Sequence, residues 1–345
     1  AALRGENVVI STPAASGKTL CYNLPALQRL LAEPRARGLY LFPTKALAHD
    51  QLAELTALTA AIPLNAAPAC YDGDTPSSAR AKIRDGSRII LSNPDMLHMG
   101  VLPQHPRWAA FFGALAVVVI DEMHVYRGVF GSHVANTLRR LRRICRFYGG
   151  KPQFILASAT IANPEELAGQ LVEAPVTLVG PEQDGAPQGE KQIILYNPPI
   201  IDPDLGIRKS AGQEAANLAA HFLEHDAQTI VFGRARLATE LMLTQLRDAL
   251  PPSQRKGARG YRSGYLASDR REIEQGLRER KVSAVVTTNA LELGIDIGHL
   301  DAAILAGYPG TVASARQQMG RAGRRHGVSA AIMVAGGGPL DQYSL

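Results

Sequence analysis

The segment Ser11–Thr19 combines small, hydroxyl and lysine residues in a pattern that binds phosphate. It reads Ser-Thr-Pro-Ala-Ala-Ser-Gly-Lys-Thr and lies between the apolar run Val8–Ile10 and a run that favours a helix, Leu20–Leu31. A loop that enters a helix presents unpaired backbone N–H groups to phosphate oxygens, while a lysine reaches the β- and γ-phosphates and a threonine binds Mg²⁺. The sequence therefore predicts a P-loop for ATP, with Lys18 on the phosphates and Thr19 on the metal. The residues expected to line the nucleotide are Thr12, Ala14, Ser16, Gly17, Lys18 and Thr19, with Thr12 where the usual pattern has glycine.

Two adjacent carboxylates follow another apolar run. Val117–Ile120 leads directly into Asp121-Glu122-Met123-His124. Open α/β sheets bind ligands at the carboxyl ends of their strands, and burying carboxylates is costly unless a metal or partner compensates them. We therefore expect Asp121 to hold Mg²⁺ and Glu122 to polarise the water that attacks the γ-phosphate. The alternative is that both residues only cap the next helix, and the P-loop earlier in the chain argues against it.

The elements that must position these residues form an alternating series. Short runs that are apolar on both faces, separated by helical stretches, predict a parallel sheet covered on both sides. The series is interrupted at Gly180–Gly212, which is rich in proline, glycine and charge and is predicted to be a linker. We therefore predict two α/β domains, 1–185 and 186–345. The predicted strands are Val8–Ile10, Leu39–Phe42, Ile89–Leu91, Val117–Ile120, Phe154–Ala157, Ile230–Phe232, Ala284–Thr287, Ala302–Leu305 and Ile332–Val334, and the predicted covering helices include Gln51–Ala61 and Ala211–His225.

Composition restricts the class of protein only loosely. The chain has 345 residues and a net charge of +6, with a pI near 9.3, which permits a polyanionic partner without requiring one. Three widely separated cysteines, Cys21, Cys70 and Cys145, suggest neither a disulfide framework nor a zinc site, so we expect a reducing, cytoplasmic setting. No apolar run approaches the roughly 20 residues of a membrane span.

Further motifs follow the strands in a fixed order. They are Phe42–Ala48, Ser92–Leu97, Ser158–Thr160, Thr287–Ile297 and Gln317–Arg324. With the P-loop and the acidic pair, this series resembles the superfamily-two helicases. The acidic tetrad is similar to the DExH form, and the segments Tyr71–Thr75, Asp121–His133, Asn136–Phe147 and Tyr261–Leu266 resemble the MrfA/Hrq-type, RecQ-related DNA-repair helicases.

The resemblance implies a fold and an activity. The fold would be two tandem RecA-like domains, each a mainly parallel sheet with helices on both faces, and ATP would bind in the cleft between them. The activity would be ATP-dependent, 3′-to-5′ unwinding of DNA in repair. A glutamine motif before the P-loop and a C-terminal four-cysteine zinc region occur in longer family members, and we expect both to lie outside this chain.

Several residues of the second half are expected to act on ATP. Arg321 and Arg324 are three residues apart on a predicted helix, so they would share a face and serve as arginine fingers, with Gln317 one turn earlier sensing the phosphate or its water. The alternative is a solvated basic helix face. Gly294 and Asp296 resemble the residues that reach the ribose, although Asp296 could be an ordinary turn aspartate.

Other residues are expected to couple ATP to a nucleic acid. Ser158 and Thr160 resemble the relay from the γ-phosphate, and His124 could join the acidic pair to Gln317 or Thr160, or could be a core histidine. A motor must ignore base sequence, so its contacts should go to phosphates. The expected nucleic-acid contacts are Thr44, Lys45, Gly73, Asn93, Asp95, Gly233, Arg234, Thr287 and Thr288. Trp108 and Tyr126 could stack on bases but are expected in the core or at an interface. Arg139–Arg143 is expected chiefly on a solvated helix face, with contact to a duplex as the alternative.

Three functions remain open from the residues themselves. The first is a monomeric DNA helicase or translocase that binds single-stranded DNA in preference to RNA. The second is a DExH-type RNA helicase, because phosphate contacts distinguish RNA only through its 2′-hydroxyl groups. The third is an ATP-gated binding module that separates no strands.

Overall fold

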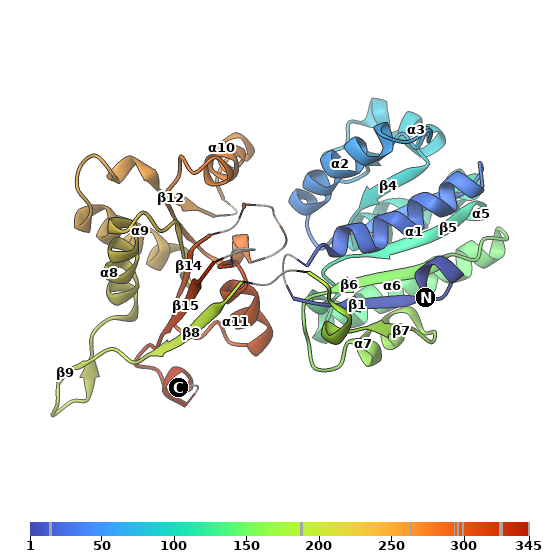
Figure 1. The fold of residues 1–345 in the computed structure, drawn as a ribbon. Coiled ribbons are helices and arrows are strands. Elements are labelled where there is room, and N and C mark those ends of the chain that lie inside the picture. Colours follow the sequence, from blue (N-terminus) through green and yellow to red (C-terminus); the bar gives the residue numbers. More distant parts are fainter. Residues whose placement is uncertain are drawn as a thin grey trace. The chain divides into compact units, whose positions relative to one another are not determined.

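The structure is a computed structural model. It describes residues 1–13, 16–186, 189–262, 264–292, 294, 297–298, 300–323 and 327–343. The chain divides into two compact units, Ala1–Gly185 and Ala186–Leu345 (Figure 1). Each unit has its own sheet, and each is described by itself below.

The first unit is built on a seven-stranded sheet in the order β3-β4-β2-β5-β6-β1-β7. All of its strand pairs are parallel, so the carboxyl ends of the strands lie along one edge. Ser11 at the end of β1 pairs with Ser158 at the end of β6, which brings the start of the P-loop beside the Ser-Ala-Thr motif. The strands are β1 (Val8–Ser11), β2 (Arg37–Leu41), β3 (Ala69–Cys70), β4 (Ile89–Ser92), β5 (Leu115–Ile120), β6 (Gln153–Ser158) and β7 (Thr177–Val179).

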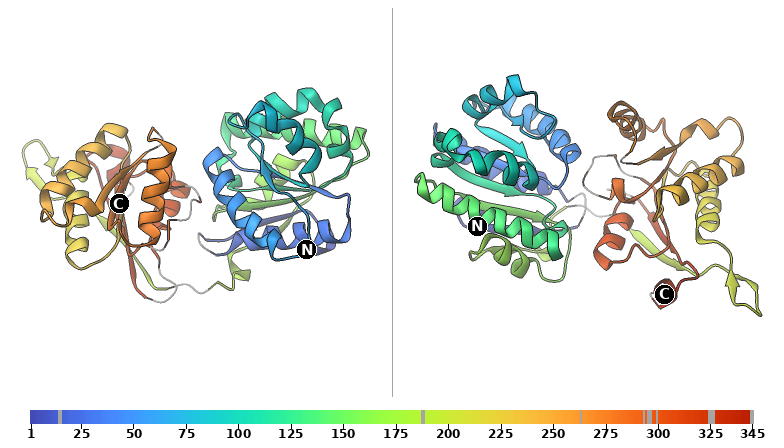
Figure 2. Two further views of the ribbon diagram at one scale, coloured as in Figure 1. Left: turned by 90° about the horizontal axis from the view of Figure 1, so that it is seen from above. Right: turned by 180° about the vertical axis from the view of Figure 1, so that it is seen from behind.

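Helices cover both faces of this sheet (Figures 1 and 2). On one face, α1 and α2 bury Tyr22 and Leu55 against strand residues such as Val119. On the other, α5, α6 and α7 bury residues such as Leu138 together with Trp108. The helices are α1 (Lys18–Ala32), α2 (Lys45–Ala60), α3 (Ser77–Gly86), α4 (Pro94–Met96), α5 (Ala109–Gly113), α6 (Gly128–Phe147) and α7 (Pro164–Val172), with shorter helical turns at Ala2–Arg4, Leu97–Val101, Leu102–Trp108, Met123–Val125 and Pro181–Gln183.

The second unit has a six-stranded sheet, also parallel throughout, in the order β12-β13-β11-β14-β15-β8. A small antiparallel hairpin, β9 with β10, stands apart from it. The strands are β8 (Lys191–Tyr196), β9 (Ile200–Asp202), β10 (Ile207–Arg208), β11 (Thr229–Phe232), β12 (Ala258–Tyr261), β13 (Ala284–Thr287), β14 (Ala302–Ala306) and β15 (Ser329–Val334). The helices are α8 (Ala211–Glu224), α9 (Arg236–Ala249), α10 (Ala267–Arg278), α11 (Val312–Met319) and α12 (Pro339–Tyr343), with turns at Arg255–Gly257 and Asn289–Leu291.

The predicted fold class is confirmed, since both sheets are parallel and together contain every predicted strand, with β3, β7, β8 and β12 in addition. The prediction that Gly180–Gly212 is only a linker is wrong. Its residues Lys191–Tyr196 form β8, which pairs with β15 at the edge of the second sheet. An edge strand needs hydrogen bonds on one side only and tolerates flanking prolines, which is why composition concealed it. Within the described ranges, no helix is long and apolar enough to cross a membrane.

Candidate nucleotide and nucleic-acid sites

The phosphate loop connects β1 to α1. Gly17 precedes the helix with φ 78°, a left-handed conformation that favours glycine, and so turns the chain into α1. The hydroxyls of Thr12 and Ser16 lie 2.5 Å apart across the loop. The Lys18 ammonium donates to the carbonyls of Thr12 at 3.1 Å and Pro13 at 2.7 Å. The loop thus holds the lysine charge beside the N-terminus of α1, where helix N–H groups are open to an anion. Ala14 lies outside the described residues.

The first carboxylate of the acidic pair is buried beside this loop. Asp121 follows β5 and is 8% exposed. Its Oδ1 accepts the Glu122 backbone N–H at 2.8 Å, and its Oδ2 lies 3.1 Å from the Tyr22 hydroxyl. Burial first, and then the charge of Glu122, raise the pKa of Asp121 to about 7, whereas the Lys18 ammonium lowers it. A cation would stabilise the ionised form of so buried a carboxyl group.

Tyr22 brings the two predicted metal ligands together. Its pKa is raised well above the ordinary value, first by burial and then by the charge of Asp121, while the nearby Thr19 side chain opposes the shift. Thr19 and Asp121 therefore both lie near the same phenol. A hydroxyl beside a carboxylate fits Mg²⁺, which prefers oxygen ligands and is commonly held by only one or two protein groups. Sequence analysis missed Tyr22, although its position one helical turn after Lys18 places both on the same face of α1.

The second carboxylate adjoins the Ser-Ala-Thr motif through a histidine. Glu122 has φ 50°, which is uncommon for a residue with a side chain and is typical of constrained functional positions. Its Oε2 lies 3.5 Å from Nδ1 of His124, and the Ala159 N–H donates to that Nδ1 at 3.3 Å. His124 is buried and contacts the backbone of this motif at Ala159, next to Thr160, one of its predicted partners.

The Ala159 carbonyl accepts hydrogen bonds from serine hydroxyls at the ends of two neighbouring strands, β1 and β6. The Ser158 hydroxyl donates to it at 2.8 Å and the Ser11 hydroxyl at 3.2 Å. Ser158 is fully buried and Thr160 is half-buried. The ends of β1 and β6 are therefore joined by the Ser11 side-chain hydrogen bond as well as by the strand register.

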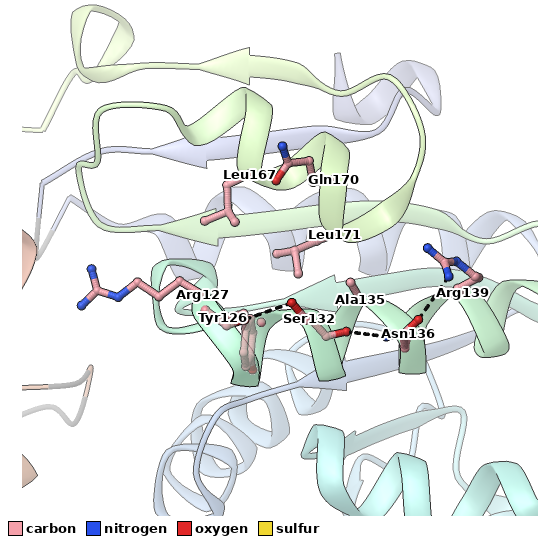
Figure 3. A pocket seen from close by; sticks show the side chains of 11 residues that line it. Tyr126, Arg127, Ser132, Ala135, Asn136, Arg139, Leu167, Gln170 and Leu171 are labelled. Carbon is pink, nitrogen blue, oxygen red and sulfur yellow. Dashed lines mark hydrogen bonds between the residues drawn. The ribbon is translucent and has the colours of Figure 1, made fainter.

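A pocket of about 370 Å³ opens beside the acidic motif, between α6 and α7 (Figure 3). Tyr126 lines its inner side and is fully buried, as predicted for a core residue. A Cβ on Gly131 would lie 2.5 Å from the Tyr126 carbonyl oxygen, so glycine permits α6 to approach this turn. Arg139 pairs with Glu173, and Arg142 donates to the carbonyl of Val172 at 2.6 Å. The basic run of α6 therefore secures the end of α7.

The nucleic-acid residues predicted in the first unit gather along one part of the sheet edge. They follow β2, β3 and β4, which are neighbours in the sheet. Thr44 caps α2 by accepting the Leu47 N–H at 3.3 Å, and Asn93 caps α4 by accepting the Met96 N–H at 2.7 Å. Lys45 pairs with Asp74 at 2.9 Å, and its Nζ would lie 3.2 Å from a Cβ on Gly73. Asp95 is exposed beside Asn93.

The corresponding residues of the second unit also lie at strand ends. Gly233 follows β11, and its N–H donates at 2.8 Å to the carbonyl of Thr287, the last residue of β13. Thr287 is fully buried and, within the described ranges, its hydroxyl has no hydrogen-bond partner. Thr288 is half-buried. Arg234 is half exposed and lies 3.2 Å from Asp341. The residues most open to a ligand here are therefore Arg234 and Thr288.

The predicted helix through both arginine fingers is wrong. Helix α11 ends at Met319, followed by Gly320, so Arg321 lies in the next turn. Its guanidinium donates to the Glu292 carbonyl at 2.7 Å, a contact that sequence analysis missed because it joins distant segments. Gln317 lies on α11 and is 7% exposed. Gly294 is half-buried, and both Arg324 and Asp296 lie outside the described residues.

A phosphate loop after β1, an acidic pair after β5 and two parallel α/β sheets define a P-loop protein with two RecA-like domains. Two family models match the chain: DEAD/DEAH box helicase over residues 1–167 and helicase conserved C-terminal domain over residues 214–326. The chain is 54% identical over 341 residues to the helicase YprA of Bacillus subtilis and 42% identical over 349 residues to the helicase HRQ1 of Saccharomyces cerevisiae. The alignments cover 99% of this chain but only 45% and 32% of those proteins.

Solved structures agree with the sequence relatives. The DUF1998 helicase MrfA bound to DNA superposes with a TM-score of 0.94 at 53% identity, over 99% of this chain and 46% of MrfA. MrfA bound to DNA and AMPPNP gives a TM-score of 0.93 at 53% identity, over 99% of this chain and 47% of that one. The first unit thus matches the DEAD/DEAH box helicase model and the second the helicase conserved C-terminal model, and the chain spans less than half the length of these relatives.

Proposed function

We propose that this chain is the motor core of an ATP-dependent DNA helicase or translocase. The observation that carries the proposal is the placement of Asp121 at the carboxyl edge of the first sheet, where its carboxylate contacts Tyr22 and feels the Lys18 charge, with Thr19 near the same phenol. MrfA, at 53% identity, binds DNA and AMPPNP, which supports DNA as the bound nucleic acid and ATP as the hydrolysed nucleotide. On the same relationship we propose 3′-to-5′ movement and a role in repair.

The residues of the proposed ATP site have different roles in binding and hydrolysis. Lys18 and the N-terminus of α1 would bind the β- and γ-phosphates, and Thr19 with Asp121 would hold Mg²⁺, which neutralises charge on those phosphates. Glu122 would orient and polarise the attacking water. We propose that Gln317, Arg321 and Arg324 act on the γ-phosphate from the second domain, with the ribose near Gly294 and Asp296. An arginine finger typically contributes about 10³ to 10⁵ in rate.

The nucleic acid would contact both domains at the strand ends that carry Thr44, Lys45, Arg234 and Thr288. These groups can bind phosphates and 2′-deoxyribose without reading bases. His124, Ser158 and Thr160 would couple the state of the γ-phosphate to this edge. We propose that the chain acts as a monomer, and the absence of a cysteine framework leads us to place it in the cytoplasm.

The proposal is tested by steady-state ATP hydrolysis with no polymer, with single-stranded DNA and with single-stranded RNA, at low and moderate salt. We expect DNA to stimulate ATP hydrolysis, and this stimulation should weaken as the salt concentration rises, because the protein contacts the DNA through its phosphates. Stronger stimulation by RNA would favour the RNA helicase alternative. Hydrolysis that ignores both polymers would reject a nucleic-acid motor within these residues.

A further inference from the structure

One cluster of side chains lies outside everything described above. His221, Glu224 and His225 stand together at the C-terminal end of α8 in the second unit. In the part of the chain that the structure describes, they are the one group of three histidine, cysteine or acidic residues whose ligand atoms all lie within 4.8 Å of one another. All three are exposed, and none belongs to the proposed motor site.

Helical spacing brings the three side chains to one place. Residues separated by three and four positions are neighbours on a helix surface, so positions 221, 224 and 225 share a face. The opposite face of α8 buries Ala216, Ala219 and Ala220 against the sheet, which keeps the cluster turned to solvent. The negative end of the helix dipole also lies here and favours a cation.

The distances suit a metal ion. His221 Nδ1 lies 3.3 Å from Glu224 Oε2. Two ligands at about 2.0–2.1 Å from a tetrahedral ion are themselves about 3.3 Å apart. Nitrogen and oxygen therefore already have the separation they would keep on one ion.

His225 is oriented in the manner usual for a metal ligand. Its Nδ1 lies 3.0 Å from the carbonyl oxygen of His221, to which it can donate, and its backbone N–H donates to the Phe222 carbonyl at 3.1 Å. Metal-bound histidines commonly give one ring N–H to a backbone carbonyl, which fixes the tautomer and directs the other nitrogen to the ion. This arrangement leaves Nε2 of His225 to bind an ion, and each of the three residues offers one ligand atom within 4.8 Å of the others.

We propose that His221, Glu224 and His225 form a binding site for a zinc-class divalent cation. Two imidazoles and one carboxylate suit Zn²⁺ and its late first-row neighbours, whereas Mg²⁺ and Ca²⁺ prefer sites made of oxygen alone. A fourth position is left for water. The ion would fasten the last turn of α8 to the chain that leads into β11, and so stabilise the second unit.

The site is separable from the motor. It lies near the start of β11, because α8 ends at Glu224 and β11 begins at Thr229, whereas Gly233 and Arg234 follow the end of that strand. Substitutions at the cluster are therefore expected to leave ATP hydrolysis unchanged, and failure of the proposed function would not affect the zinc result.

The test is calorimetric titration of the full chain with ZnCl₂ in excess MgCl₂, on a Cys21→Ser background that removes the exposed thiol. We expect one saturable site per chain. His221→Ala and His225→Ala should each weaken binding by at least about tenfold, the lower range for loss of even a supporting partner. His133→Ala removes an exposed histidine on α6 and serves as the matched control, with no expected effect.

A second readout keeps the result independent of heat signals. Zinc should raise the melting temperature of the parent protein and not that of His225→Ala, and Co²⁺ in place of zinc should give the visible absorption of a metal site that His221→Ala lacks. Equal zinc affinity in all variants, or the absence of saturable binding on the Cys21→Ser background, would overturn the proposal. Circular dichroism and unchanged ATP hydrolysis establish that each variant is folded.

Discussion

Replacing Tyr22 with phenylalanine should weaken the first unit and its proposed Mg²⁺ site together. The Tyr22 side chain is 1% exposed, and its hydroxyl lies 3.1 Å from Asp121 Oδ2 and 3.0 Å from Gln51 Oε1, to either of which it can donate. Tyr22→Phe deletes this donor and keeps the ring. A buried carboxylate that loses a hydrogen bond costs about 1–3 kcal/mol of folding free energy, and that is the loss we expect.

The neighbouring Tyr40 provides a matched control. Its ring packs edge-on against Tyr22 at a centroid distance of 6.0 Å and is also 1% exposed. Within the described ranges, however, the Tyr40 hydroxyl has no hydrogen-bond partner. Tyr40→Phe removes the same atom from the same core without breaking a bond, so it should be neutral or slightly stabilising.

The sequence provides a local probe for this comparison. Trp108 is the single tryptophan of the chain and lies in the core of the first unit, so its fluorescence during urea unfolding reports on that unit. We expect a lower urea midpoint for Tyr22→Phe, an unchanged or higher one for Tyr40→Phe, and a higher Mg²⁺ requirement for ATP hydrolysis in Tyr22→Phe alone. Equal midpoints for both variants would refute the assigned role of the Tyr22 hydroxyl.

Three further outcomes are expected. Glu122→Gln should lower ATP turnover by about 10² to 10⁴, the range for a general base, while fluorescent-nucleotide binding persists; unchanged turnover would remove Glu122 from the mechanism. Gly131→Ala places a Cβ 2.5 Å from a backbone oxygen and should lower the free energy of unfolding, followed by tryptophan fluorescence, by about 1–3 kcal/mol. Gly86→Ala is the control, because its Cβ would meet nothing within 4 Å and should leave that free energy unchanged. Similar urea midpoints for the two variants would contradict the steric reasoning. Burial raises the pKa of Cys70 and Cys145 to about 12, so at pH 8 about 10⁻⁴ of each is thiolate. A disulfide reagent should therefore react with one thiol in the native protein and with three in denaturant. Rapid reaction of all three thiols in the native protein would show that the core opens.

The sequence predicted the fold and the main chemical groups because their signals are local. The strands before the P-loop and before Asp121 are short apolar runs followed at once by polar residues, and such a pattern depends only on neighbours in the chain. Parallel pairing then brings these ends to one edge of the sheet. The adjacency of β5, β6 and β1 follows from the fold and not from spacing along the chain.

The features that were missed depend on tertiary contacts. Strand β8 takes its identity from pairing with β15, and the prolines around it dominated the local pattern. Arg321 was placed on a helix because Gly320 does not prohibit one, whereas in the structure the arginine takes the Glu292 carbonyl as its partner after α11 has ended. Neither partner could be inferred from residues nearby in sequence.

The hydrogen bonds of the first unit indicate which parts must move as one body. Tyr22 on α1 meets Asp121 after β5 and Gln51 on α2, and α2 begins at Lys45 with Thr44 as its cap. The Tyr22 hydroxyl on the helix that follows the P-loop is thus within hydrogen-bond distance of both Asp121, the proposed metal ligand, and the helix whose N-terminus bears two proposed nucleic-acid contacts. A displacement of α1 on binding phosphate would have to break the Gln51 contact or carry α2 with it. Because α2 packs its buried residues into the same core as Tyr22, carrying it along is the less costly outcome. This bond provides a physical connection by which the first domain alone could transmit nucleotide binding to its nucleic-acid edge.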